Sequence, residues 1–521
     1  MWSVSRWVLT IVLSGLSFSE VVAQCPARPD TGTVVNNPVS ISSQNGVLSA
    51  ELTMARSVDS AGYTHYCYKY FAGNQVIEAP TLRVNRGDEL VLDVLNRIQD
   101  DDPMKVKMAM AGSGDNVCGD GGAPTVDATN VHFHGMNISP RCHEDDVLNT
   151  LIQPGKGAFK YDIRIPQTQM PGLYWYHPHV HGFTEFQVNG GAAGALIVEG
   201  MEKIHPEVAG LTERVFIVRQ QYLVPWVPGP YELTLNYQVA PLPGHTPAKP
   251  IIQMKPGEKQ FWRVANATIQ DFLPLQVTVN GKAQPLEVVA LDGYPLAKIR
   301  TQDTILIPPA GRAEFIVQAP ASDAIATLDT GAYSTGPTGN PDIAQPLAAI
   351  QVTDKAASSP IPKAPSSVEE SDARNLADQS VTAQRRLYFS EEFGGTNGPI
   401  QFYLTVEGQK QKVFEADERP VITTKVGAVE DWTIENRALE THAFHIHQIH
   451  FLVMEVDGKP VADKDLRDTV EIPYWDGKGP YHSVKVRMDF RDPKISGMFV
   501  FHCHILLHED LGMMHKILVE P

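Results

Sequence analysis

Short runs in which apolar and polar residues alternate recur along the whole chain. They include "ELVLDVL" from Glu89, "GALIVEG" from Gly194, "TILIPPAGRAEFIVQA" from Thr304 and "HFLVMEVDG" from His450. The runs are rich in β-branched residues and lie between Gly, Pro or Asn, which is the pattern of strands separated by turns. Apolar positions at helical spacing are scarce. The pattern therefore predicts an all-β protein built of sandwich domains.

Three segments of the chain resemble one another, each with an extended stretch, a glycine turn and a strand that ends in asparagine. The segments are "APTLRVNRGDELVLDVLNR", "PIIQMKPGEKQFWRVANA" and "PVITTKVGAVEDWTIENR". Their glycines lie 170 residues apart in both intervals, and an asparagine follows each glycine nine residues later: Gly87 and Asn96, Gly257 and Asn266, and Gly427 and Asn436. Equal spacing in both intervals indicates three copies of one domain.

The repeat predicts how the 521 residues are divided. We expect the first domain at about residues 40–200, the second at 208–355, a polar linker at 356–385 and the third at 386–521. The length of the chain agrees with this division, since proteins of this size usually contain about three or four domains of roughly 150 residues.

The first residues, "MWSVSRWVLTIVLSGLSFSEVVAQ", have the features of a secretory signal peptide. Arg6 is an early positive charge, the run from Trp7 to Phe18 is apolar, and Val21 to Ala23 form a small-residue cleavage site. We expect residues 1–23 to be removed and the protein to be secreted or periplasmic. A retained anchor is the alternative, but an apolar run of about a dozen residues is too short to span a bilayer, so we expect no membrane association.

Charge and cysteine content narrow the function further. The formal net charge of -17 argues against binding nucleic acid, which requires clustered Lys and Arg. Export permits disulfides, and Cys25, Cys67, Cys118 and Cys142 could pair in three ways, which leaves Cys503 as an odd thiol. An unpaired or partly reduced set is the alternative.

Histidines are concentrated in four short windows. Of the 18 histidines, 12 lie within 132–134, 177–181, 442–450 and 502–508. A single histidine is usually an ordinary hydrogen-bonded or exposed side chain. Four His-x-His elements point to metal binding instead, because residues i and i+2 of a strand lie on one face and two imidazoles can then converge on an ion. Two windows lie in the expected first domain and two in the third, so we expect a site shared between them.

The last window, "FVFHCHILLHEDLGMMH", places Cys503 between His502 and His504. On a strand, these two histidines face one way and the cysteine the other, so one peptide can serve two metal sites back to back. A thiolate, two imidazoles and a distant thioether form the blue-copper electron-transfer set. Zinc is the competing metal, but structural zinc sites close with four ligands and show no preference for Cys between two His.

The ligands divide accordingly. Cys503, His508 and Met513, completed by His442, would form the blue-copper site. Eight paired histidines remain for three further coppers in groups of two, three and three: His132, His134, His177, His179, His445, His447, His502 and His504. His143, His181, His450 and His515 are surplus, and we interpret each as structural or as a support behind the ligands.

These motifs together resemble those of the three-domain multicopper oxidases, the laccase-like enzymes. The resemblance implies three consecutive cupredoxin-like Greek-key β-sandwich domains and four coppers. It assigns His132 and His445 to type 2 copper, the other six paired histidines to the type 3 pair, and the Cys503 set to type 1. Phe133 and Ala443 depart from the common Trp and Pro, but neither departure changes a ligand.

The resemblance also implies a reaction. A small reductant gives up single electrons at the type 1 site, and O2 is reduced to two waters at the trinuclear site. Phenols, aromatic amines, bilirubin and cuprous or manganous ions all remain open as donors. A copper carrier, a cupredoxin relative without copper and a copper nitrite reductase fit the ligand pattern less well. An axial Met513 predicts a low-to-intermediate potential, and we expect a monomer.

Water formation also consumes protons at a buried cluster, which requires carboxylate relays. Glu509 directly follows His508, and in similar enzymes an acid at this place connects to the trinuclear cluster. Asp145, in "RCHEDDVLN", is a second candidate, although Glu144 or Asp146 could take its place. The alternative is that these acids are solvated loop residues.

Overall fold

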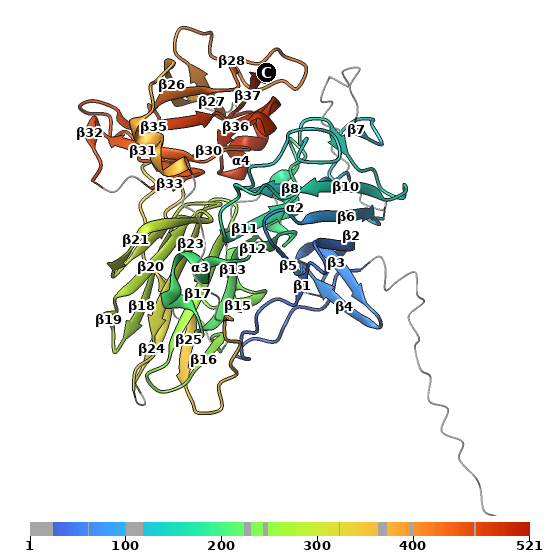
Figure 1. Ribbon diagram of the computed structural model, residues 1–521, viewed down its shortest axis with the longest axis vertical. Helices are drawn as coiled ribbons and strands as arrows, with labels where there is room; N and C mark the ends of the chain where they lie inside the picture. The colour runs from blue at the N-terminus through green and yellow to red at the C-terminus, as the bar shows by residue number, and fades with distance from the viewer. Residues whose placement is uncertain are drawn as a thin grey trace, which may run out of the picture.

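The fold is almost entirely β-structure arranged in three successive two-sheet units (Figure 1). The computed structural model describes residues 24–60, 62–99, 118–222, 231–242, 248–321, 324–362, 372–394, 400–462 and 465–521. The expected signal peptide, residues 1–23, lies outside the described residues. The all-β class predicted from the alternating pattern is confirmed.

The first sandwich contains two five-stranded sheets, ordered β1-β5-β12-β11-β8 and β10-β6-β2-β3-β4, and a separate pair β7-β9. Its strands are β1 (Ser40–Ser42), β2 (Val47–Val58), β3 (Thr64–Ala72), β4 (Gln75–Glu78), β5 (Thr81–Val84), β6 (Glu89–Asn96), β7 (Cys118–Gly119), β8 (His132–His134), β9 (Thr150–Leu151), β10 (Phe159–Arg164), β11 (Gly172–His177) and β12 (Gly194–Val198). The short helix α2 (Thr184–Asn189) lies between β11 and β12 in the chain.

The second sandwich follows α3 (Met201–Ile204) and the 3-10 turn η1 (Pro206–Val208). Its sheets are ordered β15-β14-β13-β17-β23-β20-β21 and β16-β25-β24-β18-β19, with β22 paired to β18. The strands are β13 (Thr212–Tyr222), β14 (Tyr231–Leu235), β15 (Gln238–Ala240), β16 (Ile251–Met254), β17 (Lys259–Ala267), β18 (Leu273–Val279), β19 (Lys282–Ala283), β20 (Leu286–Leu291), β21 (Tyr294–Gln302), β22 (Ile305–Ile307), β23 (Arg312–Gln318), β24 (Ala326–Thr330) and β25 (Gln345–Val352).

The third sandwich has sheets ordered β27-β26-β29-β35-β31-β32, with β33 paired to β31, and β28-β37-β36-β30-β34. Its strands are β26 (Ala383–Phe393), β27 (Ile400–Val406), β28 (Ile422–Lys425), β29 (Ala428–Asn436), β30 (His442–Ile446), β31 (Phe451–Val456), β32 (Lys459–Pro460), β33 (Leu466–Arg467), β34 (Thr469–Ile472), β35 (His482–Phe490), β36 (Gly497–Cys503) and β37 (Met514–Glu520). The helical elements are η2 (Asp372–Asp378), η4 (Pro493–Ile495) and α4 (Leu506–Asp510).

The sequence repeat corresponds to a structural repeat. In the three sandwiches β6, β17 and β29 each pair in parallel with β2, β13 and β26. The amides of Asn96, Asn266 and Asn436 are buried, and each donates to two backbone carbonyls at 2.7 to 3.0 Å. Each asparagine therefore ties a strand end to two neighbouring segments, which explains why the residue recurs in every copy.

Apolar cores inside and between the sandwiches hold the units together. Alternate residues of β6 face the first core, as its period of two predicts. A separate apolar cluster that includes Leu173, Trp175, Val215 and Ala265 joins the first two sandwiches. All three units meet where Val188, Ile269 and Leu506 pack together.

Both disulfides lie in the first sandwich, joining Cys25 to Cys67 and Cys118 to Cys142. Cys503 remains a free, buried thiol, as the odd count of cysteines predicted. Among the described residues, no helix is long and apolar enough to cross a membrane.

Candidate metal centre

Strand pairing brings the histidine windows together in two pairs. In the first sandwich, His132 on β8 lies opposite His177 on β11. In the third, His445 on β30 lies opposite His502 on β36. These two strand pairs face each other, and α4 packs close to α2 (Figure 1). The predicted sharing of one site between the first and third units is therefore what the structure shows.

All eight paired histidines are buried at this junction and form three groups that could each hold a metal ion. In each group the ligand atoms lie within 4.8 Å of one another. The groups are His132, His134 and His445; His134, His177 and His504; and His179, His447 and His502. Each group combines both sandwiches, so neither unit could form the cluster alone.

In three of these histidines, His132, His134 and His445, one ring nitrogen has a hydrogen-bond partner and the other has none. His132 donates through Nδ1 to Asp145 at 3.0 Å, and His445 donates through Nδ1 to the carbonyl of Asp468 at 2.8 Å. Within the described residues, Nε2 of His132, Nδ1 of His134 and Nε2 of His445 are buried without a hydrogen-bond partner. Unpaired buried nitrogens are costly unless an ion binds them, so this donor set fits copper.

Burial also sets the protonation state of the cluster. It lowers the pKa of His177 to about 3 and of His502 to about 4, and burial with neighbouring imidazoles holds the pKa of His132 well below its ordinary value. Such imidazoles are neutral at physiological pH, and a neutral ring nitrogen is the form that binds a metal.

The second kind of site lies on the other face of β36. The Cys503 Sγ is 3.6 Å from Nδ1 of His442 and 3.9 Å from Nδ1 of His508, and these two nitrogens are 3.3 Å apart. Burial raises the pKa of the Cys503 thiol, so a bound cation is needed to stabilise the thiolate. Met513 is buried in the same apolar cluster as Cys503, and its backbone N–H donates to the carbonyl of His508 at 2.8 Å.

Two acidic side chains lie behind the histidines of this second site. Oε1 of Glu391 is 3.4 Å from Nε2 of His442, and Oε2 of Glu440 is 3.6 Å from Nε2 of His508. Burial and the neighbouring Glu391 raise the pKa of Glu440 to about 8. The ring of Phe402 stacks on His508 with a centroid separation of 4.0 Å.

Both proposed relay acids are buried beside the histidine cluster. Oε2 of Glu509 is 3.2 Å from Nδ1 of His502, and Oε1 is 3.5 Å from Nε2 of His179. Asp145 also accepts from the backbone N–H of Phe133 at 3.0 Å and from Gln448. Neither acid is a solvated loop residue, and Asp145 rather than Glu144 or Asp146 contacts His132.

Sequence reasoning missed Asp468, Glu391, Glu440 and Gln448. Asp468 is fully buried against His134, at 3.3 Å, and against Arg312. Burial alone would raise the pKa of Asp468, but the positive charge of Arg312 holds this pKa well below its ordinary value. Asp468 and Glu391 lie outside every histidine window. Gln448 lies inside the 442–450 window and Glu440 two residues before it, but the spacing does not show which side chain each contacts.

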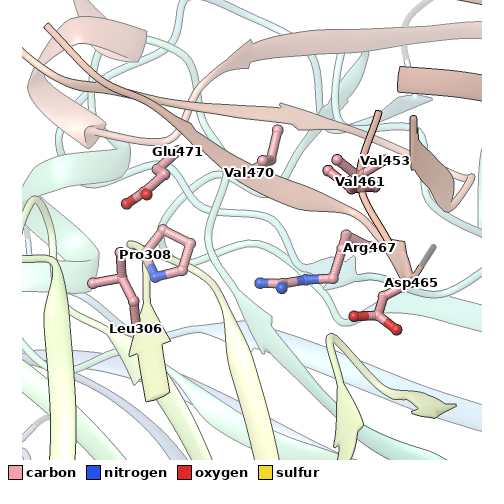
Figure 2. Close-up of a pocket in the computed structure, with 8 residues that line it drawn as sticks. All are labelled: Leu306, Pro308, Val453, Val461, Asp465, Arg467, Val470 and Glu471. Atoms are coloured by element: carbon pink, nitrogen blue, oxygen red, sulfur yellow. The ribbon is translucent and has the colours of Figure 1, made fainter. Parts of the chain in front are cut away.

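A pocket of about 270 Å³ lies between the second and third sandwiches (Figure 2). It is lined by Leu306, Pro308, Val453, Val461, Asp465, Arg467, Val470 and Glu471. None of these residues belongs to the histidine groups. The pocket borders the strand that follows Asp468, and it is therefore a neighbour of the metal centre rather than part of it.

Comparisons with known proteins agree with this geometry. Three sequence models described as multicopper oxidase match residues 123–203, 218–339 and 394–521, and together they cover more than half of the chain. The chain is 23% identical over 506 residues to multicopper oxidase mco of Staphylococcus haemolyticus, spanning 91% of this chain and 93% of that protein. It is 22% identical over 479 residues to a laccase of Bacillus subtilis, spanning 85% and 89%.

Solved structures show the same fold. A multicopper oxidase from Campylobacter jejuni, described as a metallo-oxidase, superposes with a TM-score of 0.66 at 22% identity, covering 95% of this chain and 96% of that one. McoA from Aquifex aeolicus gives a TM-score of 0.68 at 18% identity, covering 94% and 99%. The predicted fold of three cupredoxin domains and the copper cofactor are confirmed. The chain belongs to the multicopper oxidase family, whose members oxidise a reducing substrate and reduce O2.

Proposed function

We propose that the protein is a laccase-like oxidase that takes single electrons from a small phenolic or aromatic amine donor and reduces O2 to two waters. One observation carries the proposal: the buried thiol of Cys503 faces His442 and His508, while the adjacent His502 and His504 face the eight-histidine cluster. Bound copper supplies one-electron redox chemistry at both places. The twelve predicted ligands and their copper types remain our assignment.

The chain itself provides a short connection between the two places. Cys503 is bonded through the backbone to His502 and to His504. In addition, Nδ1 of His502 donates a hydrogen bond to the carbonyl of Cys503 at 2.9 Å. This contact fixes the ring of His502 and shortens the path from the thiol to the cluster.

We place the donor beside His508. The imidazole of His508 is nearly buried, but the neighbouring Glu440 is only partly buried. The carboxyl group of Glu440 can accept a hydrogen bond from an O–H or N–H group of the reductant. Phe402 is buried against the ring of His508 and makes the surroundings of this imidazole aromatic and apolar. A flat phenol or aromatic amine with one polar group matches this combination.

A metal ion is the second candidate donor. Glu391 and Glu440 both lie against the histidines of the Cys503 site, and their mutual repulsion contributes to the raised pKa of Glu440. At neutral pH this pair therefore holds a proton, and a small cation that displaces the proton is bound by two carboxylates. A cuprous or manganous ion is therefore favoured by one specific feature of this site.

We propose that Glu509 and Asp145 hold and pass the protons that water formation requires. Glu509 contacts His502 and His179, whereas Asp145 contacts His132 on the opposite side. Burial and the nearby Asp510 raise the pKa of Glu509 well above its ordinary value, so it can hold a proton at physiological pH.

Oxygen uptake tests the proposal. The copper-loaded protein should consume one O2 for every four molecules of a one-electron phenol, without releasing peroxide. The same assay with cuprous and manganous salts distinguishes the second donor class. Peroxide as the main product would contradict the proposal, and so would failure to oxidise any of these donors.

We also propose that the protein is an exported monomer. The features of residues 1–23 support export, and N-terminal sequencing of the mature protein should then begin at Gln24. Light scattering should give the mass of one chain. A retained Met1 or a larger mass would contradict these two points separately.

A further inference from the structure

The second sandwich supplies no histidine to the cluster, yet one of its side chains reaches a cluster ligand through a single intermediate residue. Arg312, at the start of β23, is buried and donates from Nη1 to Oδ1 of Asp468 at 2.7 Å. It donates from Nη2 to Oδ2 of the same carboxylate at 2.5 Å. The contact is bidentate, which is the most directional form of an Arg–carboxylate pair.

Asp468 in turn contacts two histidines that come from different sandwiches. Its Oδ1 lies 3.3 Å from Nε2 of His134, and its backbone carbonyl accepts from Nδ1 of His445 at 2.8 Å. These contacts leave Nδ1 of His134 and Nε2 of His445 unpaired and directed into one histidine group. A residue that holds the outer nitrogen of an imidazole determines which nitrogen faces the metal.

Arg312 is itself firmly held. Nη2 also donates to the carbonyl of Asp292 at 2.8 Å, Nη1 to that of Ala310 at 3.1 Å, and Nε to that of Leu173 at 3.3 Å. Leu173 lies on β11, the strand that carries His177. The guanidinium is therefore fixed by the first and second sandwiches while it orients a carboxylate of the third.

The glycine of the "VHFHG" window leaves the space for this ion pair. Gly135 has a φ of +81°, and a Cβ at this position would lie 2.4 Å from Nη2 of Arg312 and 2.6 Å from Oδ2 of Asp468. Gly135 therefore lies directly against the ion pair of Arg312 and Asp468. Backbone, arginine and aspartate from three sandwiches meet at one point behind the cluster.

We propose that Arg312 is a positioning residue for the trinuclear site: it orients the Asp468 carboxylate, which holds His134 with Nδ1 facing the cluster. The second sandwich then controls the geometry of a metal centre to which it gives no ligand. The inference rests on the copper assignment and on O2 reduction, but not on the identity of the electron donor.

A merely structural role for Arg312 predicts something different. A clamp between sandwiches would affect stability and every copper alike, whereas a positioning residue should affect the trinuclear coppers and spare type 1. Arg300 provides a matched control, since it pairs with Asp465 at the same interface, three residues before Asp468. Asp465 is among the residues that line the pocket in Figure 2, whereas Asp468 is fully buried and is not one of them.

The test compares copper-loaded Arg312→Lys, Asp468→Asn and Arg300→Lys with the native enzyme. For the first two we expect an altered near-ultraviolet absorption of the type 3 pair, to which His134 is assigned, loss of trinuclear copper and reoxidation by O2 slowed by about 10- to 100-fold. Type 1 absorbance and its anaerobic reduction should be unchanged. Arg300→Lys should match the native enzyme throughout.

The double variant Arg312→Lys/Asp468→Asn makes the test sharper. If Arg312 acts through Asp468, the double variant should be no worse than Asp468→Asn alone, because the two effects are not additive. Additive effects, an unchanged type 3 absorption in Arg312→Lys, or equal losses of type 1 and trinuclear copper would each overturn the inference. If Arg312→Lys does not fold, Asp468→Asn tests the same pair. If the native protein binds no copper, the copper assignment is wrong, and this inference fails with it.

Discussion

Two adjacent methionines follow His508, and they face different surroundings. Met513 packs with Cys503 in the core of the third sandwich, whereas Met514 packs with Phe414 and Val500 on the other side. Met513 is therefore the residue placed to act as a weak axial ligand, and a thioether at this position lowers the potential of a blue-copper site.

We expect Met513→Leu to raise the type 1 potential, because the axial donor is lost while the buried volume is nearly conserved. Redox titration of the visible absorption measures this potential. Met514→Leu is the matched control and should leave the potential unchanged. A shift in the control alone would mean that Met514 occupies the axial position.

At this scale the sequence predicted histidines and a cysteine that the structure brings together, because His-x-His and His-Cys-His spacing is imposed by the two-residue period of a strand. Their assignment as copper ligands remains a prediction. The sequence did not predict the residues behind these side chains. Asp468 contacts His134, and Glu440 contacts His508, in each case between segments that are distant in the sequence. Which imidazole nitrogen each acid contacts depends on the folded geometry, which the motif spacing does not encode.

The helix α4 contacts both metal sites, as do the strands β30 and β36, which carry ligands of each. His508 lies against Cys503, while the next residue, Glu509, lies against His502 and accepts from Thr184 of α2 at 3.1 Å. One helical turn therefore carries a type 1 histidine on one side and a carboxyl group beside the trinuclear histidines on the other.

We expect Glu509→Gln to slow reoxidation of the fully reduced enzyme by O2 by about 10²-fold or more, because a positioned proton donor contributes that much. The amide keeps the shape but cannot deliver a proton. Stopped-flow reoxidation should also show a larger solvent isotope effect, while anaerobic reduction of type 1 copper continues at its native rate. Native reoxidation with full copper content would remove Glu509 from the proton path.

The contact between α4 and α2 also contains the carboxyl group of Glu185, whose ionisation at high pH destabilises the folded state. Asp510 accepts from the backbone N–H groups of Gly182, Thr184 and Glu185 at 2.8 to 3.1 Å. The side chain of Glu185 is buried next to it, and Oε2 of Glu185 has no partner among the described residues. Burial, with the Asp510 charge, raises the pKa of Glu185 to about 8.

The sign of the effect follows from proton binding. Above its ordinary pKa of 4.5, Glu185 loses its proton in the unfolded chain but keeps it in the folded one until about pH 8. Stability contributed by this group therefore falls as the pH rises through that window. Glu185→Gln should be more stable than the native protein at pH 8, by on the order of a few kcal/mol, and similar to it near pH 4.5.

Calorimetry of holoenzyme across that pH range measures the difference. Glu207→Gln, a change at an exposed position, should give a curve parallel to that of the native protein. Parallel curves for Glu185→Gln as well would show that Glu185 ionises in the folded state as it does in the unfolded one.

Element prediction succeeded where a local signal existed. The glycine turns are present in every unit, β6 and β29 end at Asn96 and Asn436 as predicted, and β17 runs one residue beyond Asn266. The strand order and the parallel pairing of β2 with β6 could not be predicted from the sequence, because strand pairing depends on burial between distant segments. The domain boundaries remain predictions, and β26 begins at Ala383, slightly before the expected start of the third domain.

On the scale of the whole molecule, the two kinds of copper site differ in what they connect. The predicted type 1 ligands all lie in the third sandwich, on β30, β36 and α4 and just before β37. Each trinuclear histidine group instead contains ligands from the first and third sandwiches. Trinuclear copper should therefore hold two units together, whereas type 1 copper should stabilise one unit internally.

Removing copper should reveal this difference. A ligand that binds only the native state stabilises it, and here that state requires the first and third sandwiches to be docked. We expect complete copper removal to lower the unfolding temperature strongly. Cys503→Ser, which removes the thiol but none of the trinuclear histidines, should lose the blue absorption yet keep most of the thermal stability. Calorimetry of holoenzyme, apoenzyme and variant, with copper content measured for each, tests the argument. If Cys503→Ser loaded with trinuclear copper unfolded as early as the apoenzyme, the joining role would belong to the protein interface rather than to the metal cluster.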